Sequence, residues 1–106
     1  MPAHYRMYRN TMSELASLLR EADDLKQDQI AAVQEVIDFY RDSLPSITDF
    51  GFFADSCRRA FADIEHEIAM ARYGEESDEA YAVFIEGQMR LGYRFAPGAI
   101  AQLRYW

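Results

Sequence analysis

Residues 27–44, QDQIAAVQEVIDFYRDSL, place apolar side chains three or four positions apart along the whole stretch. The series consists of Ile30, Val33, Ile37, Tyr40 and Leu44. Because an α-helix turns once every 3.6 residues, this spacing puts the series on one face and leaves charged side chains on the other. Pro45 follows, and a proline disfavours helical geometry in the residue before it. The stretch therefore predicts an amphipathic helix that ends at its last leucine.

The segment before it begins with a helix-capping pattern. Thr11 and Glu14 stand three positions apart, an arrangement in which each side chain can accept a hydrogen bond from the other residue's backbone N–H. Leucines and alanines then recur on one face as far as Leu25. We expect a helix over residues 12–25, preceded by an N-terminal tail, residues 1–10, that is free to be flexible.

Two further helices are predicted in the second half of the chain. The third enters at one of residues 46–49 and runs to Tyr73, where Gly74 provides a left-handed stop. The fourth spans residues 77–92, with Ser77 as its N-terminal cap. Acidic residues in its first turn complement the helix dipole.

Together these segments predict an all-α fold, a compact bundle of four to five helices in a single domain, residues 1–106. The fifth is a short closing helix over residues 97–105, because Pro97 suits a first helical turn. Alternating strand patterns are nearly absent, and loops of two to six residues favour antiparallel neighbours. The expected core consists of Leu15, Leu19, Val33, Ile37, Tyr40, Phe53, Cys57, Phe61, Ile64, Ile68, Phe84, Ile85 and Leu91.

The chain is acidic, and its charge is uneven. It carries 11 basic and 18 acidic residues, for a net charge of −7. Residues 21–86 account for −12, whereas residues 1–20 carry +2 and residues 87–106 carry +3. Attraction to phosphates requires a positive surface, so we expect neither a nucleic acid nor a membrane as partner. A basic protein would be attracted to this negatively charged chain and is therefore a more favourable partner.

The length of the apolar runs and the number of cysteines indicate in which cellular compartment the protein is expected. The longest strongly apolar runs, such as residues 82–85, are far shorter than the roughly 20 residues that cross a bilayer. The first residues lack the apolar stretch of a secretory signal. A single cysteine, Cys57, cannot form an intramolecular disulfide and suits a reducing compartment. We therefore expect a cytoplasmic protein.

Few residues have the pattern of a catalytic or metal site. Cys57 falls within an apolar stripe, which is typical of a structural cysteine. Asp63 and His66 share a helical face at a spacing that carboxylate-bridged metal sites use, but a second carboxylate–histidine pair is needed and only His4 remains. We therefore expect no enzyme, no catalytic residue, no metal and no cofactor.

The densest run of acidic residues lies between the third and fourth predicted helices, and a smaller cluster lies between the first and second. Tyrosines flank the larger run, and a rigid aromatic side chain beside acidic groups is a common anchor in protein interfaces. Helix capping and solubility are the alternative interpretation. The candidate partner-binding residues are Tyr73, Glu75, Glu76, Asp78, Glu79 and Tyr81, with Asp23, Asp24 and Asp28.

The C-terminal segment interleaves arginines with aromatic residues, in YRF at residues 93–95 and RYW at residues 104–106. Such a segment can bind a partner. It can equally dock on the helices, with its arginines facing the acidic middle of the chain. The pattern leaves both interpretations open.

Two functions follow from these features. The leading hypothesis is a small acidic protein-binding module, an inhibitor or immunity-type protein that masks a basic surface of a partner such as a nuclease. Many small bacterial domains are acidic for solubility alone, so acidity by itself only favours this function. The alternative is a self-associating structural or adaptor protein that forms a homodimer, with Phe39, Phe52 and Met70 left outside a monomer core.

Overall fold

A computed structural model describes residues 4–92, and within this range the chain is helical and contains no strand. It forms α1 (Tyr5–Glu21), α2 (Gln27–Ser43), the 3-10 turn η1 (Leu44–Ser46), α3 (Phe50–Tyr73) and α4 (Asp78–Arg90). The all-α prediction is therefore confirmed for this part of the chain. The predicted closing helix over residues 97–105 lies outside the described residues.

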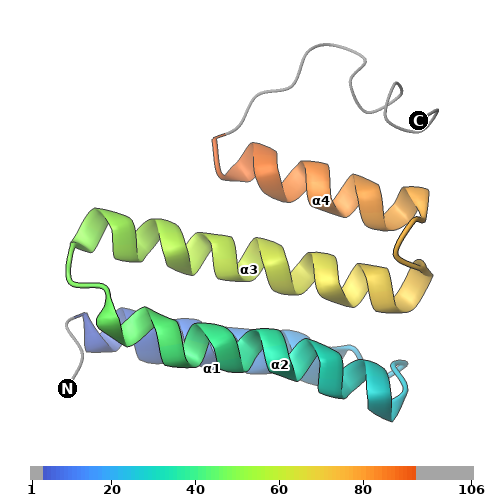
Figure 1. The fold of residues 1–106 in the computed structure, drawn as a ribbon, viewed down its shortest axis with the longest axis horizontal. Helices are drawn as coiled ribbons and strands as arrows, with labels where there is room; N and C mark the ends of the chain where they lie inside the picture. Colours follow the sequence, from blue (N-terminus) through green and yellow to red (C-terminus); the bar gives the residue numbers. More distant parts are fainter. Residues whose placement is uncertain (1–3, 93–106) are drawn as a thin grey trace.

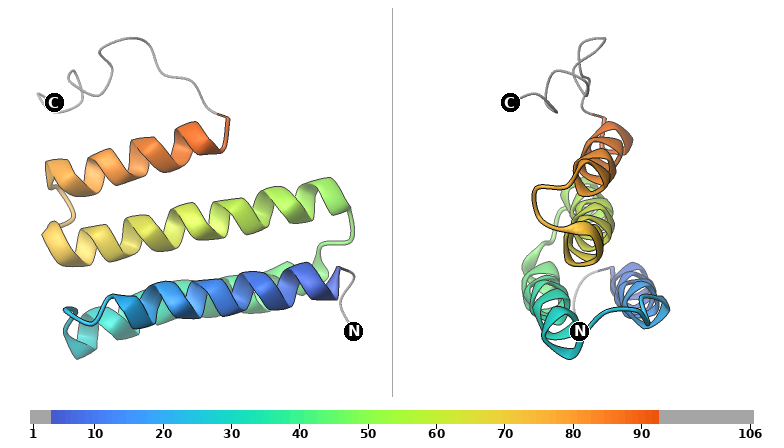
Figure 2. Two further views of the ribbon diagram at one scale, coloured as in Figure 1. Left: turned by 180° about the vertical axis from the view of Figure 1, so that it is seen from behind. Right: turned by 90° about the vertical axis from the view of Figure 1, so that its right-hand side faces the viewer.

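The four helices pack in layers around α3 (Figures 1 and 2). α1 and α2 lie side by side, α3 packs across this pair, and α4 lies on the far side of α3. Successive helices run in opposite directions, as the short loops predict. Residues 4–92 measure 47 × 35 × 17 Å. α4 therefore rests on α3, while α3 is the one described helix that packs against all the others.

The core has two parts, one among the first three helices and one at the η1 end. The larger part joins all three helices through Leu15, Val33, Ile37 and Ile64, which are almost wholly buried. In the smaller part, Leu44, Phe53 and Cys57 pack against Met7 and Tyr8 of α1. Burying these apolar side chains supplies most of the favourable free energy of folding.

The first helix differs from its predicted bounds at both ends. α1 begins at Tyr5, so residues 5–10 of the predicted tail form its first turns. Thr11 is only 4% exposed and lies inside the helix instead of capping it. The helix ends at Glu21, four residues early, yet Ala22 and Leu25 of the predicted stripe are buried from the loop that follows.

The other three helices keep close to their predicted bounds, because Pro45 and Gly74 interrupt the chain where the patterns indicated. Most of the expected core is buried or half-buried. Phe84 is an error in that prediction, since 36% of its surface is exposed. α4 is too short and touches too few helices to bury a broad apolar face.

Small side chains carry much of the contact between α3 and α4. Ala62 and Ala69 of α3 are buried, as are Ala80 and Gly87 of α4. A Cβ atom built on Gly87 would lie 3.1 Å from the Cβ of Ala62, closer than ordinary van der Waals contact. The absence of a side chain at this glycine therefore sets the distance between the two helices.

Candidate functional site

The two predicted acidic clusters lie at the same end of the molecule. The α1–α2 and α3–α4 loops are both at the right-hand end of the view in Figure 1. We call residues 21–28 and 72–79 the acidic end. It contains eight acidic and two basic residues, more than two fifths of the 18 acidic residues of the chain. Folding therefore joins clusters that are about 50 residues apart in sequence.

Two contacts connect the loops of the acidic end. The Arg72 guanidinium donates two hydrogen bonds, each 2.8 Å long, to the two carboxylate oxygens of Asp24. The bond to Arg72 lowers the pKa of Asp24 below its ordinary value. The Gln29 side chain donates a 2.8 Å hydrogen bond to the carbonyl oxygen of Ala71. Asp24 was predicted from the sequence as a site residue, whereas Arg72 and Gln29 were not.

The acidic residues of this end differ in their position relative to the helix dipoles. Asp28, Asp78 and Glu79 lie in the first turns of α2 and α4, where negative charge is favourable. The pairs at 23–24 and 75–76 lie in the loops that leave the C-terminal ends of α1 and α3 and enter α2 and α4, so the dipole of one helix disfavours them and the dipole of the next favours them. Helix capping therefore accounts for three of the eight acidic residues and leaves five, the two pairs and Glu21, without such a role.

Residues of both acidic clusters line one shallow hollow. Asp28 of α2 and Glu75 of the α3–α4 loop line it together with Glu67 and Met70 of α3. Its volume is about 230 Å³. Three carboxylates thus surround one half-buried methionine, an arrangement that offers an apolar contact within a negative surface.

The two candidate tyrosines have different surroundings. Tyr73 is half exposed at the end of α3 and lines a hollow with Leu18 of α1 and Val83 of α4. The Tyr81 ring lies 6.2 Å from the Phe84 ring. That ring in turn lies 5.1 Å from His66. Tyr73 therefore lies within the acidic end, whereas Tyr81 belongs to an aromatic row along α3 and α4.

The groups with catalytic potential are engaged in packing or internal hydrogen bonds. Tyr40 donates a hydrogen bond to Asp63, and burial together with this bond raises the pKa of Tyr40. His66 packs against an aromatic ring. Burial also raises the pKa of the Cys57 thiol, which keeps it protonated and weakly nucleophilic. Within residues 4–92, no three histidine, cysteine or acidic side chains are grouped closely enough to hold a metal ion.

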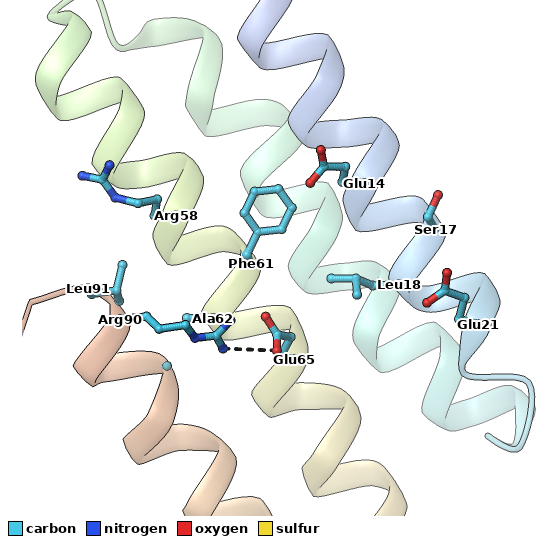
Figure 3. A pocket seen from close by; sticks show the side chains of 11 residues that line it. Glu14, Ser17, Leu18, Glu21, Arg58, Phe61, Ala62, Glu65, Arg90 and Leu91 are labelled. Carbon is cyan, nitrogen blue, oxygen red and sulfur yellow. Dashed lines mark hydrogen bonds and ion pairs between the residues drawn. The ribbon is translucent and has the colours of Figure 1, made fainter.

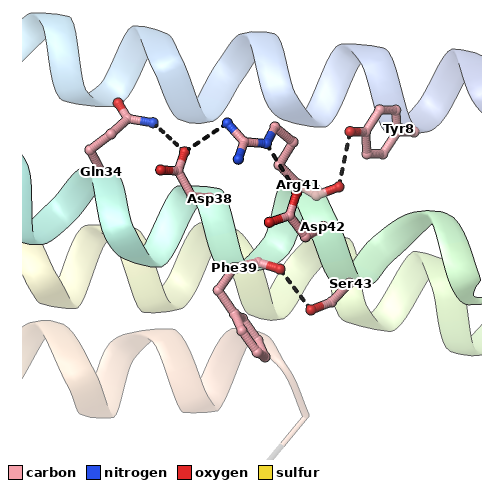
Figure 4. Close-up of polar contacts among 7 residues, drawn as sticks. All are labelled: Tyr8, Gln34, Asp38, Phe39, Arg41, Asp42 and Ser43. Carbon is pink, nitrogen blue, oxygen red and sulfur yellow. Dashed lines mark hydrogen bonds and ion pairs between the residues drawn. The ribbon is translucent and has the colours of Figure 1, made fainter.

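A polar network on α2, which the sequence analysis did not identify, lies away from the acidic end (Figure 4). Gln34 and Arg41 both donate hydrogen bonds to Asp38, at 2.9 and 3.0 Å. Tyr8 of α1 donates to the backbone carbonyl of Arg41. The Tyr8 contact joins α1 to α2, and the neighbouring Phe39 is exposed.

Comparison with known proteins finds no family model, no curated protein and no solved structure that matches this chain. Among the helices of residues 4–92, none combines the length and the apolar composition needed to cross a lipid bilayer.

Proposed function

We propose that this protein is a non-catalytic binding module that recognises a basic surface of another protein through its acidic end. The observation that carries the proposal is the position of Asp23, Asp24, Glu75 and Glu76 beyond the C-terminal ends of α1 and α3. The opposing helix dipoles give these carboxylates no net stabilisation, and within residues 4–92 Asp24 alone of the four is held by an arginine. A basic partner would neutralise the others.

The nine candidate residues keep their proposed role, with Tyr73 as the aromatic anchor and Tyr81 as a more distant contact. A surface that concentrates one sign of charge speeds encounter with an oppositely charged protein and rejects partners of like charge. An inhibitor or immunity-type protein that covers the basic active surface of a cytoplasmic enzyme such as a nuclease would need such a negatively charged surface. It needs no metal or cofactor of its own.

The test is a charge reversal measured on a purified complex. The full chain, tagged and expressed in its native host, is used to isolate the protein that copurifies with it. The affinity of that protein is then measured for the wild type and for Glu75→Lys/Glu76→Lys. We expect the double variant to weaken binding about tenfold or more, mainly through slower association, because electrostatic steering is lost.

The matched control is Glu35→Lys/Glu86→Lys, which reverses two exposed acidic residues on α2 and α4 and gives the same net charge. We expect it to retain nearly all of the affinity. Raising the salt concentration should weaken the wild type and this control alike. Equal losses in both double variants, or an affinity that salt leaves unchanged, would contradict the proposal.

A second candidate function, self-association, rests on a different observation. Phe39 and Phe52 are 62% and 61% exposed, and Phe50 and Met89 are also more than half exposed. Large apolar side chains exposed on three helices are typical of surfaces that meet another chain. Met70, which the sequence analysis grouped with them, is half-buried.

A further inference from the structure

A groove runs between α1 and α4, with α3 as its floor (Figure 3). Its volume is about 480 Å³. Leu18 of α1, Phe61 and Ala62 of α3, and Leu91 after the end of α4 supply its apolar surface. Except for Ala62, these side chains are only half-buried. The groove thus leaves apolar surface in water that an additional segment of chain could cover.

The α1 rim of the groove is negatively charged. Glu14 and Glu21 line it, and both are exposed. Neither forms an ion pair with another residue in the range 4–92. Glu65 on the floor differs, because Arg90 of α4 donates a 3.2 Å hydrogen bond to it. Arg58 of α3 also lines the groove and forms an ion pair with Asp55. The groove therefore fits an occupant that is apolar on one side and carries arginine or lysine next to the α1 rim.

The chain's own residues 93–106 have this composition. They contain Arg94 and Arg104 and no acidic residue. More than half of them are apolar or aromatic, including Ile100 and Leu103, which are three positions apart. A segment with both properties complements an apolar groove with an acidic rim, as amphipathic helices complement the grooves that bind them.

The point where this segment begins also favours the groove. Leu91 lines the groove, and residue 93 follows only two positions later. A tethered segment binds its neighbouring site at an effective concentration in the millimolar range, so even a weak contact is occupied. A helix over the predicted range 97–105 would be about 14 Å long, and α4, which forms one wall, is about 20 Å long. The segment therefore fits along the wall.

We propose that residues 93–106 dock in the groove between α1 and α4, with their apolar side chains on Leu18 and Phe61 and their arginines beside Glu14 and Glu21. Docking would place a fifth element on α3 and give α4 a second neighbour. This proposal concerns a contact within the chain, whereas the proposed function concerns a partner bound by the acidic end. Each can be correct without the other.

Trp106 provides a direct test because it is the only tryptophan in the chain. Its fluorescence emission and its quenching by acrylamide are measured in the full chain and in a synthetic peptide of residues 93–106, which serves as the fully exposed standard. We expect blue-shifted emission and severalfold weaker quenching in the full chain. Emission and quenching equal to those of the free peptide would overturn the proposal.

Two groove variants and one control locate the contact. Leu18→Asp places a charge on the apolar surface of the groove at a residue that also packs against the core, and Glu14→Arg/Glu21→Arg reverses the charge of the rim at two exposed positions. We expect both to raise quenching toward the peptide value with unchanged helical circular dichroism. The control, Glu35→Arg/Glu86→Arg, reverses two exposed acidic residues on α2 and α4 that do not line the groove, and it should leave Trp106 protected. Protection that survives both groove variants would show that the segment docks elsewhere.

Dilution separates docking within one chain from exchange between two copies. An intramolecular contact leaves the emission of Trp106 independent of protein concentration, and this is the expected result. Protection that disappears on dilution would mean that the segment docks on a second copy, which contradicts the proposal as stated.

Discussion

At the scale of single residues, the pair of Arg72 and Asp24 connects the two halves of the acidic end. Both side chains are at the surface, where salt screens such pairs, and their role is to position the loops more than to stabilise the fold. The pair also brings one positive charge into a region that is otherwise dominated by carboxylates.

This pair has a definite pH dependence. Because hydrogen bonding to Arg72 lowers the pKa of Asp24 from its ordinary value of 3.8, the contribution of the pair to the free energy of unfolding is complete above that value. It is lost as the pH falls through the lower folded-state pKa. We expect Arg72→Gln to raise the pKa of Asp24 toward 3.8, as measured by carboxyl carbon NMR.

Arg41→Gln is the matched control, because Arg41 is equally part of an exposed arginine–aspartate contact but binds Asp38 and Asp42. Its substitution should leave the titration of Asp24 unchanged. An identical titration in the wild type and in Arg72→Gln would contradict the assigned cause of the shift.

The sequence could indicate the carboxylates of the site but not this pairing. Asp24 and Arg72 are 48 positions apart, and no periodicity relates a loop residue to the last turn of a distant helix. The same holds for Gln29 and Ala71. Gln29 and Ala71 meet because α2 and α3 pack antiparallel. The sequence predicts antiparallel neighbours, but it does not predict which residues of the two helices face each other.

At the scale of helices, apolar periodicity succeeded where large side chains form the stripe. It placed α2 over nearly its observed range, because Val33 and Ile37 carry the buried face and Pro45 follows shortly after the last helical residue. It missed the first two turns of α1, where Tyr8 and Thr11 continue the stripe and the capping pattern suggested a later start. Apolar periodicity also gave too little weight to the alanine contacts between α3 and α4, because small side chains give a weak apolar signal.

The contact of Gly87 with Ala62 leads to a prediction about α4. Gly87→Val inserts a branched side chain where even a Cβ atom would lie 3.1 Å from the Ala62 Cβ. We expect the free energy of unfolding to fall by about 1–3 kcal/mol, the usual effect of overpacking, as measured by urea denaturation.

The same substitution at Gly51 is the control. This glycine is exposed in the first turn of α3, and a Cβ there would meet only the Asp49 carboxylate at 3.5 Å, an ordinary contact. We expect Gly51→Val to stay within about 0.5 kcal/mol of the wild type. Equal effects of the two variants would mean that helix propensity, and not the α3–α4 distance, decides stability.

At the scale of the whole molecule, the exposed phenylalanines predict the oligomeric state under the second candidate function. If the chain self-associates, light scattering at rising concentration should show the mass approaching that of a dimer. Phe39→Ser/Phe52→Ser should hold it at the monomer mass, because an interface loses its largest apolar contacts.

Ala31→Ser, at an exposed position on α2 with a small side chain, is the control and should still associate. Circular dichroism should be the same for all variants, since the two rings contribute little to the core. A monomer mass for the wild type at every concentration would reject self-association and leave the acidic end as the proposed interface.

The layered arrangement makes α4 a replaceable part of the molecule. Among the described helices, α3 is the one that packs extensively against α4. Substitutions within residues 78–90 can therefore accumulate without disturbing the packing of α1 against α2. A different helix of similar length in its place would have to keep a residue without a side chain opposite Ala62 and buried side chains like those of Ala80 and Ile85. Evolution or protein engineering could thus exchange one wall of the groove while retaining the other three helices as a scaffold.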